Sequence, residues 1–136
     1  MDPAPVAFSD DKFRRRFVVL HHEDREGVHY DLMIESGSAL ATWKLRHPPE
    51  SGEQRCLRIG DHRRAYLDYE GPISGDRGRV TRHDEGWCTV READAAVQHG
   101  SATSILMFEG RVLRGEYSLA SSDSQGSEWL FCRVRT

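Results

Sequence analysis

The chain has 136 residues, which is enough for one domain with its own hydrophobic core. Its formal net charge of −3, from 19 basic and 22 acidic residues, argues against a protein that wraps nucleic acid through bulk positive charge. Cys56, Cys88 and Cys132 are far apart and form no CxxC pair, which excludes a zinc knuckle or a disulfide scaffold and predicts reduced, buried thiols.

The N-terminal segment contains prolines and acidic residues but no continuous apolar stretch. It therefore resembles neither a signal peptide nor a membrane anchor. We expect a flexible arm over residues 1–14, a single domain over residues 15–136 and a cytoplasmic location.

Most of the chain alternates apolar and polar residues with a period of two, which is typical of β-strands. One short helix is expected over 91–100, and Trp43, Trp87 and Trp129 are expected to pack in the core or at a barrel end. The fold class is predicted to be all-β (mainly β): a closed or nearly closed β-barrel of about eight strands with one short helix. The predicted strands are 16–20, 29–35, 40–45, 55–59, 77–83, 86–92, 104–110, 111–120 and 128–134.

The stretch HHEDREGVHYDLMIE, residues 21–35, holds three of the seven histidines. On a strand, His29 and Asp31 project from one face, whereas Tyr30 and its alternate neighbours face the core. His21 or His22 would come from the end of the preceding strand, across a polar loop. Two imidazoles and a carboxylate suit a divalent transition metal, although surface histidines on a two-faced strand explain the spacing equally well.

A second polar patch, GDHRRAYLDYEGPISGDRG, covers residues 60–78. It places His62 four residues before Tyr66 and ends in a glycine-rich turn beside several arginines. Such a patch can hold a phosphate.

Three blocks in this order resemble the 3′-phosphoesterase domain of bacterial DNA ligase D, the end-healing module of nonhomologous end joining. The family pattern of a strand ending in His, a short loop and H-Y-D-F-R-L-E is matched by FVVLHH and HYDLMIE. Its second block is matched by DHRRAYLDYEGPISG, and its last strands by MFEGRVLRGEYSLA and EWLFCRV. The resemblance covers residues 16–134.

The resemblance implies a β-barrel whose hydrophilic crater holds a divalent metal, with manganese expected. It implies removal of a 3′-terminal ribonucleoside and then of the 3′-phosphate, by a freestanding, monomeric domain that binds no membrane. The implied metal ligands are His22, His29 and Asp31, and the implied catalytic residues, His62 and Tyr66, contact the scissile phosphate. The implied partners are DNA or RNA-tipped DNA 3′ ends, and a DNA-repair ligase or polymerase.

The chain also departs from the family pattern. The arginine that clamps the phosphate in the family falls on Met33, and a thioether cannot replace a guanidinium. The choice of His22 over His21 depends on where a one-residue gap is placed, and the shorter loop favours His22. Arg55 and Arg64 are weak phosphate-binding candidates, and a larger set of substitutes for the clamp also includes Arg25, Arg77 and Lys44.

Two other functions remain open at this point. One is a noncatalytic or divergent barrel that binds nucleic-acid ends or repair partners, which the loss of the arginine favours. The other is an enzyme with the same metal chemistry and a different phosphoester substrate. A divalent ion with a phosphate-like anion beside it would favour catalysis.

Overall fold

A computed structural model describes residues 14–92, 103–121 and 127–134. The described residues form nine strands and two short 3-10 helices, η1 and η2. The strands are β1 (Arg15–Asp24), β2 (Gly27–Ser36), β3 (Ala39–Leu45), β4 (Gln54–Arg63), β5 (Gly71–Pro72), β6 (Arg79–Glu92), β7 (Thr103–Gly110), β8 (Arg114–Ser121) and β9 (Glu128–Arg133), and the helices are η1 (Pro49–Ser51) and η2 (Arg64–Leu67).

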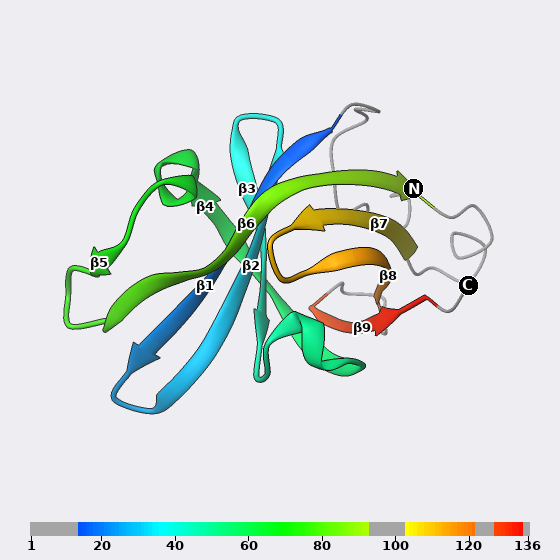
Figure 1. Cartoon of the computed structure of the whole chain (residues 1–136). Helices are drawn as coiled ribbons and strands as arrows, with labels where there is room; N and C mark the ends of the chain where they lie inside the picture. The colour runs from blue at the N-terminus through cyan, green and yellow to red at the C-terminus, as the bar shows by residue number, and fades with distance from the viewer. Residues whose placement is uncertain (1–13, 93–102, 122–126, 135–136) are drawn as a thin grey trace, which may run out of the picture.

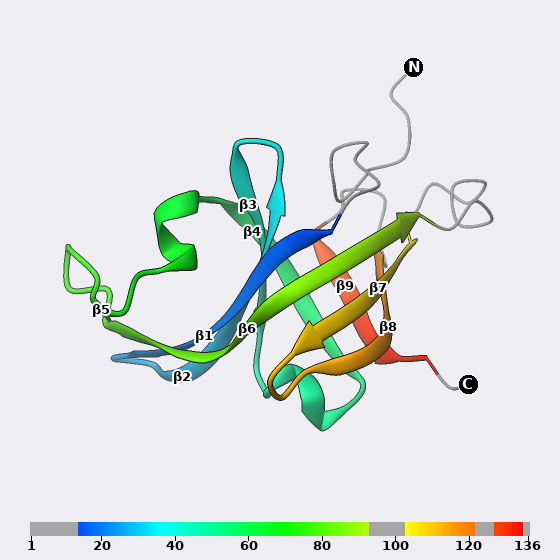
Figure 2. The same cartoon turned by 45° about the horizontal axis from the view of Figure 1, so that its top comes forward.

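The strands form one antiparallel sheet that closes on itself (Figures 1 and 2). Their order is β1-β2-β3-β4-β9-β8-β7-β6-β5, and β6 also pairs with β1. Eight strands therefore complete a barrel. The two-residue β5 is outside this ring and pairs with the first residues of β6, Arg79 and Val80. The β-barrel predicted from the sequence is confirmed.

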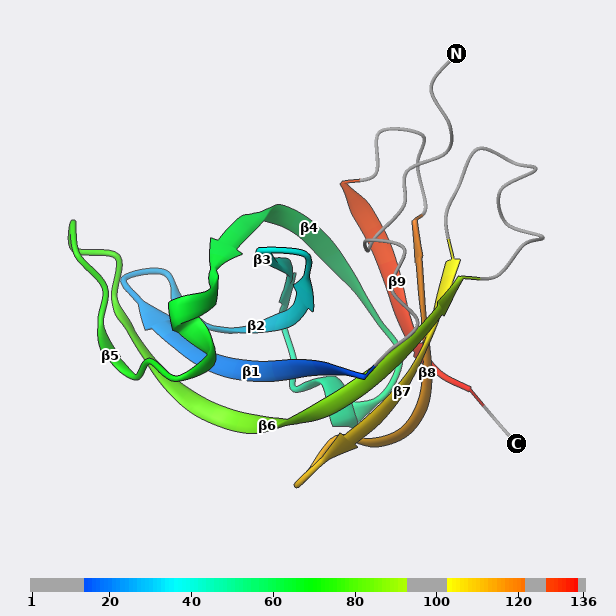
Figure 3. The ribbon, with the colours of Figure 1, turned by 90° about the horizontal axis from the view of Figure 1, so that it is seen from above.

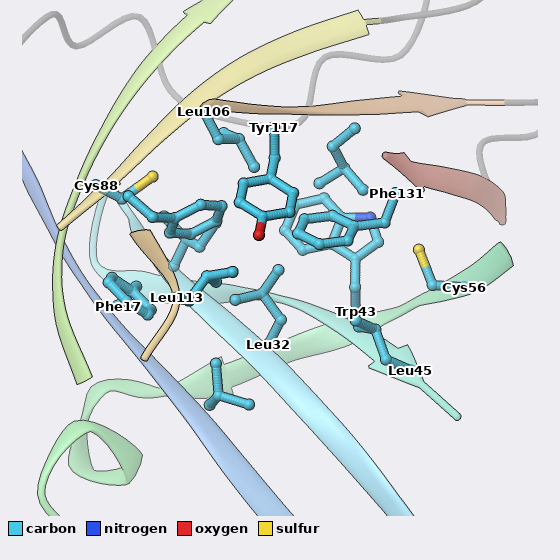
Figure 4. Packing of buried hydrophobic residues seen from close by; sticks show 14 of the residues in the cluster. Phe17, Leu32, Trp43, Leu45, Cys56, Cys88, Leu106, Leu113, Tyr117 and Phe131 are labelled. Carbon is cyan, nitrogen blue, oxygen red and sulfur yellow. The ribbon is translucent and has the colours of Figure 1, made fainter. Parts of the chain in front are cut away.

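The main core fills the barrel with aromatic and branched side chains (Figure 4). Trp43 and Trp129 meet edge to face with ring centroids 5.6 Å apart, and Tyr117 stacks on Phe131 at 4.9 Å. The prediction that Trp43 and Trp129 are core residues is confirmed. The same prediction for Trp87 is wrong, because its side chain points outward and lies beneath the Arg14 guanidinium.

A second, smaller apolar cluster lies on the opposite face of β1 and β2. Figure 3 shows η2 and β5 on this side of the molecule and β7, β8 and β9 on the other side. Both faces of the β1–β2 pair are therefore buried around Met33. The cluster contains Val18, Leu20, Met33, Leu40, Leu67 and Val80.

Several predicted element boundaries are corrected. The segments predicted over 77–83 and 86–92 are joined in one strand, β6, which begins at Arg79 and continues through a bulge where its pairing with β1 shifts register. The strand predicted over 111–120 begins at Arg114, because residues 111–113 form the turn after β7. The predicted helix begins at Arg91, but Arg91 and Glu92 end β6, and residues 93–100 lie outside the described part of the chain.

The thiols agree in part with the prediction of buried cysteines. Cys56 and Cys88 are free and buried, and this burial raises the pKa of each thiol to about 12. Cys132 is only partly buried, and its thiol lies 3.1 Å from a carboxylate oxygen of Glu53. In the part of the chain that the structure describes, no helix has the length and apolar character needed to cross a bilayer.

Candidate metal centre

The β1–β2 hairpin brings the two histidines together. The two strands pair from Phe17 and Ile34 to the tip, with His22 directly opposite His29. The stretch expected to be a polar loop is therefore strand as far as Asp24, and the turn is only two residues long. Because directly opposed residues of antiparallel strands project to the same side, both imidazoles lie on one face.

The third member of the group, Asp31, lies between the two rings. His22 Nδ1 is 3.1 Å from Oδ2 of Asp31, and His29 Nε2 is 3.1 Å from Oδ1. One possible ligand atom from each residue falls within 4.8 Å of the others. The carboxylate side chain is only 5% exposed and each imidazole 14%. His21, in contrast, packs its ring against Tyr30 and does not join the group.

A backbone carbonyl holds the His22 ring in place. His22 Nε2 lies 2.7 Å from the carbonyl oxygen of Arg77, which can only accept a hydrogen bond, so this nitrogen carries the proton. Gly78, at φ +91°, allows the Arg77–Gly78 segment to lie against β1, because a side chain there would collide with Glu23 and Asp24. Nδ1 is thus directed at Asp31. Metal-binding histidines typically use their second nitrogen in this way.

The contacts within the group favour an anionic Asp31 and a protonated His22. Burial alone would raise the pKa of Asp31, but the neighbouring imidazoles of His22 and His29 outweigh burial and hold that pKa below its usual value. The hydrogen bond to Asp31 raises the pKa of His22 above its ordinary value, against the opposing effect of burial. A divalent cation binds the anionic carboxylate and neutral imidazoles, so it would displace the proton that Asp31 favours on His22.

The three residues fit a bound metal ion. Oδ1 of Asp31 is buried and has no hydrogen bond of acceptable geometry, although His29 lies at ion-pair distance. Nitrogen and carboxylate donors suit divalent first-row transition metals. Ligand atoms about 2.1 Å from one ion lie up to about 4.2 Å apart, so a small closure of the three groups would let them share an ion.

His62 and Tyr66 form a second polar group on the same face. His62 lies on β4 and Tyr66 on η2, and their rings meet edge to face at 5.5 Å. His62 pairs with Leu40, which pairs with Glu35, four positions along β2 from Asp31. Four residues of strand span about 13 Å. The structure thus brings His62 and Tyr66 together but places Met33 and its apolar neighbours between them and the three metal candidates.

The arginines considered as phosphate-clamp substitutes have different surroundings. Arg64 forms an ion pair with Glu35, and Arg25 forms one with Asp76. Arg77 donates to the backbone carbonyl and hydroxyl of Ser74. Arg55 lines a cavity that also includes His29, whereas Arg77 contacts His22 through its backbone carbonyl.

A comparison with protein families assigns the chain. The model of the DNA ligase D 3′-phosphoesterase domain matches residues 20–121. The chain belongs to this family. The match begins in β1 and ends in β8, so it includes His22, His29, Asp31, His62 and Tyr66. No curated protein matched the chain. The resemblance inferred from the sequence is confirmed at the level of the family.

Two further basic residues lie beside the candidate metal centre. Lys44 was only one of several clamp candidates, and Arg46 was not singled out. Both line the cavity that His29 borders. The sequence did contain a signal, because Thr42, Lys44 and Arg46 alternate along and just beyond β3 and so project to the face that carries Met33 and Asp31.

Proposed function

We propose that this chain is a manganese-dependent 3′-phosphoesterase that acts on nucleic-acid 3′ ends in DNA repair. The observation that carries the proposal is the buried Asp31 carboxylate, with an imidazole nitrogen 3.1 Å from each of its oxygens, in a chain of the 3′-phosphoesterase family. Its substrates would be DNA or RNA-tipped DNA ends that carry a 3′-phosphate or a 3′-ribonucleoside.

His22, His29 and Asp31 would hold the divalent ion. Asp31 supplies the negative charge, and Arg77 keeps Nδ1 of His22 directed at the ion through its hydrogen bond to Nε2. When bound, a divalent ion polarises a phosphoryl oxygen and stabilises the charge that develops during hydrolysis. The paired strands that carry the three residues fix their geometry, so little reorganisation accompanies binding.

His62 and Tyr66 would contact the substrate phosphate from the other side of Met33. His62 Nδ1 lies 2.9 Å from the carbonyl oxygen of Gly60, which assigns the proton to Nδ1 and leaves Nε2 for the substrate. Nε2 can then accept a proton from a phosphate oxygen, or donate one when the ring is charged. Because the two groups are separated along the sheet, we expect the scissile phosphate to bridge them only once a strand is bound.

The spacing between His62 and the histidine–aspartate group also favours a second candidate function. Met33 is buried in apolar contacts and supplies no charge between the two groups. A barrel of this kind could bind nucleic-acid ends without turnover. The two functions differ in whether a bound 3′-phosphate is released.

The test is manganese-dependent release of phosphate from a primer–template that ends in a 3′-phosphate. Removal of a group that only orients a metal ligand lowers metal affinity or activity by about 10- to 100-fold. We therefore expect His29→Ala to lower the rate of phosphate release by at least that factor. His62→Ala, which removes the group proposed to transfer a proton, should lower the rate of phosphate release by about 100-fold or more. His47→Ala is the matched control, because His47 is exposed and its side chain lies outside both groups. Wild-type protein that binds manganese but releases no phosphate would contradict the proposal.

A further inference from the structure

A cavity of about 420 Å³ lies beside the candidate metal centre. His29 forms part of its wall, and three basic residues from β3, its C-terminal extension and β4 form another part: Lys44, Arg46 and Arg55. The cavity therefore joins a possible metal ligand to a group of cations.

Lys44 is the cation nearest to Asp31 in the register of the sheet. The two residues are direct partners in the β2–β3 pairing, so their side chains project to the same face. Directly opposed residues have Cβ atoms about 4.5–5.5 Å apart, so a phosphate bound to a metal ion held by Asp31 and His29 would lie within reach of a lysine ammonium. Lys44 forms no ion pair with any residue in the described part of the chain.

Arg46 and Arg55 form a like-charged pair at the same cavity. Leu45 pairs with Cys56, so Arg46, which follows Leu45, lies opposite Arg55, which precedes Cys56. Like charges directly opposite each other destabilise a sheet. Neither guanidinium has an ion-pair partner among residues 14–92, 103–121 and 127–134. A bound anion would relieve this repulsion.

The acidic residues of the cavity limit the number of phosphate groups that it can bind. Asp24 and Glu26 belong to the β1–β2 hairpin and Glu128 to β9. Asp24 is already engaged, since its carboxylate accepts a hydrogen bond from the backbone of Glu26 at 2.8 Å. Three acids against three bases fit the binding of a few phosphates at one strand end, rather than a long backbone tract.

We propose that Lys44 holds the terminal phosphate of the 3′ end bound at the metal centre, and that Arg46 and Arg55 hold the next phosphodiester of the same strand. This inference rests on the proposed 3′-phosphoesterase function. Lys44 and Arg46 are two residues apart, which in a strand is about 6.6 Å. Lys44 thus sets specificity for a phosphorylated end, the arginine pair adds affinity for the strand, and the buried Met33 has no part in charge recognition.

The test measures binding without turnover. A fluorescent primer–template whose 3′ end carries a nonhydrolysable methylene phosphonate is titrated with protein and manganese, and a 3′-hydroxyl primer–template serves as the second probe. Lys44→Gln should weaken binding of the phosphonate probe by about 10- to 100-fold, the worth of a charged hydrogen bond, and leave the hydroxyl probe unchanged. Lys44→Arg should restore most of the affinity.

Arg46→Gln and Arg55→Gln should weaken the binding of both probes. Each should also reduce the magnitude of the slope of log affinity against log salt by about 0.9. Arg111→Gln is the matched control, since Arg111 is 81% exposed and lies outside the cavity. Direct manganese titration of Lys44→Gln, without nucleic acid, should match the wild type.

The outcomes separate this inference from the proposed function. If the wild type releases 3′-phosphate and Lys44→Gln binds the phosphonate probe as tightly as the wild type, the role of Lys44 is overturned and the function stands. If Lys44→Gln loses manganese, the lysine acts on the metal centre, which also overturns its role. If Lys44→Gln selectively loses the phosphonate probe but the wild type never releases phosphate, the anion site is supported and the phosphoesterase function fails.

Discussion

At the scale of single residues, the candidate metal centre depends on a two-residue spacing on β2 and on the register in which β2 pairs with β1. His29 and Asp31 are two positions apart on β2, and His22 lies opposite His29 on β1. This spacing puts all three on one face, and Arg77 and Gly78 then orient the His22 ring. The pattern on β2 was visible in the sequence. The contact with Arg77 was not, because it joins residues 55 positions apart.

Met33 shows why the neighbourhood of the group was harder to predict. Its alternate neighbours along β2 are polar, yet Met33 packs in the cluster that includes Leu67 of η2 and is only 1% exposed. We therefore expect Met33→Arg to destabilise the protein rather than to restore phosphate binding by an arginine. An unpaired charge in this cluster should lower the free energy of unfolding by about 3 kcal/mol or more.

Urea denaturation of Met33→Arg, with Met33→Leu as the matched control, measures this effect. Methionine and leucine have similar volumes, so the control should lose less than about 1.5 kcal/mol. A stable Met33→Arg protein with a gain in phosphate affinity would contradict the assignment of Met33 to an apolar cluster.

At the scale of elements, β6 shows where strand prediction fails. Asp84 and Glu85 indicate a turn between the strands predicted over 77–83 and 86–92, because aspartate followed by a glycine is typical of turns. In the structure the strand continues through a bulge, and Asp84 serves a distant turn instead. Its carboxylate accepts hydrogen bonds from the backbone N–H of Arg111 at 2.8 Å and of Leu113 at 2.7 Å.

Asp84→Ala should destabilise the barrel through the turn between β7 and β8. Asp84 is 2% exposed, and its removal leaves the buried N–H of Leu113 and the neighbouring N–H groups without acceptors. We expect the free energy of unfolding to fall by about 3 kcal/mol, since each unsatisfied buried group costs about 1–3 kcal/mol.

Asp61→Ala provides the comparison for Asp84→Ala, because Asp61 forms an exposed ion pair with Arg58 that is worth at most about 1 kcal/mol. Chemical denaturation of both variants checks the prediction. Equal losses in the two variants would show that the carboxylate of Asp84 does not hold the turn.

At the scale of the whole molecule, closure of the barrel by β1 and β6 links the two apolar clusters. β1 contributes Phe17 and Val19 to the main core, and Val18 and Leu20 to the smaller cluster. The fold class was predictable, because alternation and turn residues recur along the chain. The closure was not, because it depends on a pairing between strands more than fifty residues apart.

Shared strands predict a single cooperative unfolding transition. Trp43 and Trp129 report on the main core by fluorescence, and far-ultraviolet circular dichroism reports on the whole sheet. Release of β1 from one cluster would also expose its side chains in the other cluster to water. The fluorescence and circular dichroism signals should therefore change at the same urea concentration. A sheet signal that persists after the tryptophan signal has changed would contradict this coupling.

The most direct test of the central claim is the number of manganese ions bound per chain, measured by equilibrium dialysis for the wild type and for Asp31→Asn. The amide has nearly the shape of the carboxylate but lacks the charge that faces the two imidazoles. The proposed metal centre predicts one ion bound by the wild type and at least a 100-fold weaker affinity in Asp31→Asn, about 2.7 kcal/mol, given that several kilocalories per mole accompany loss of a buried charge partner. Equal manganese binding by the two proteins would show that His22, His29 and Asp31 are not the metal centre.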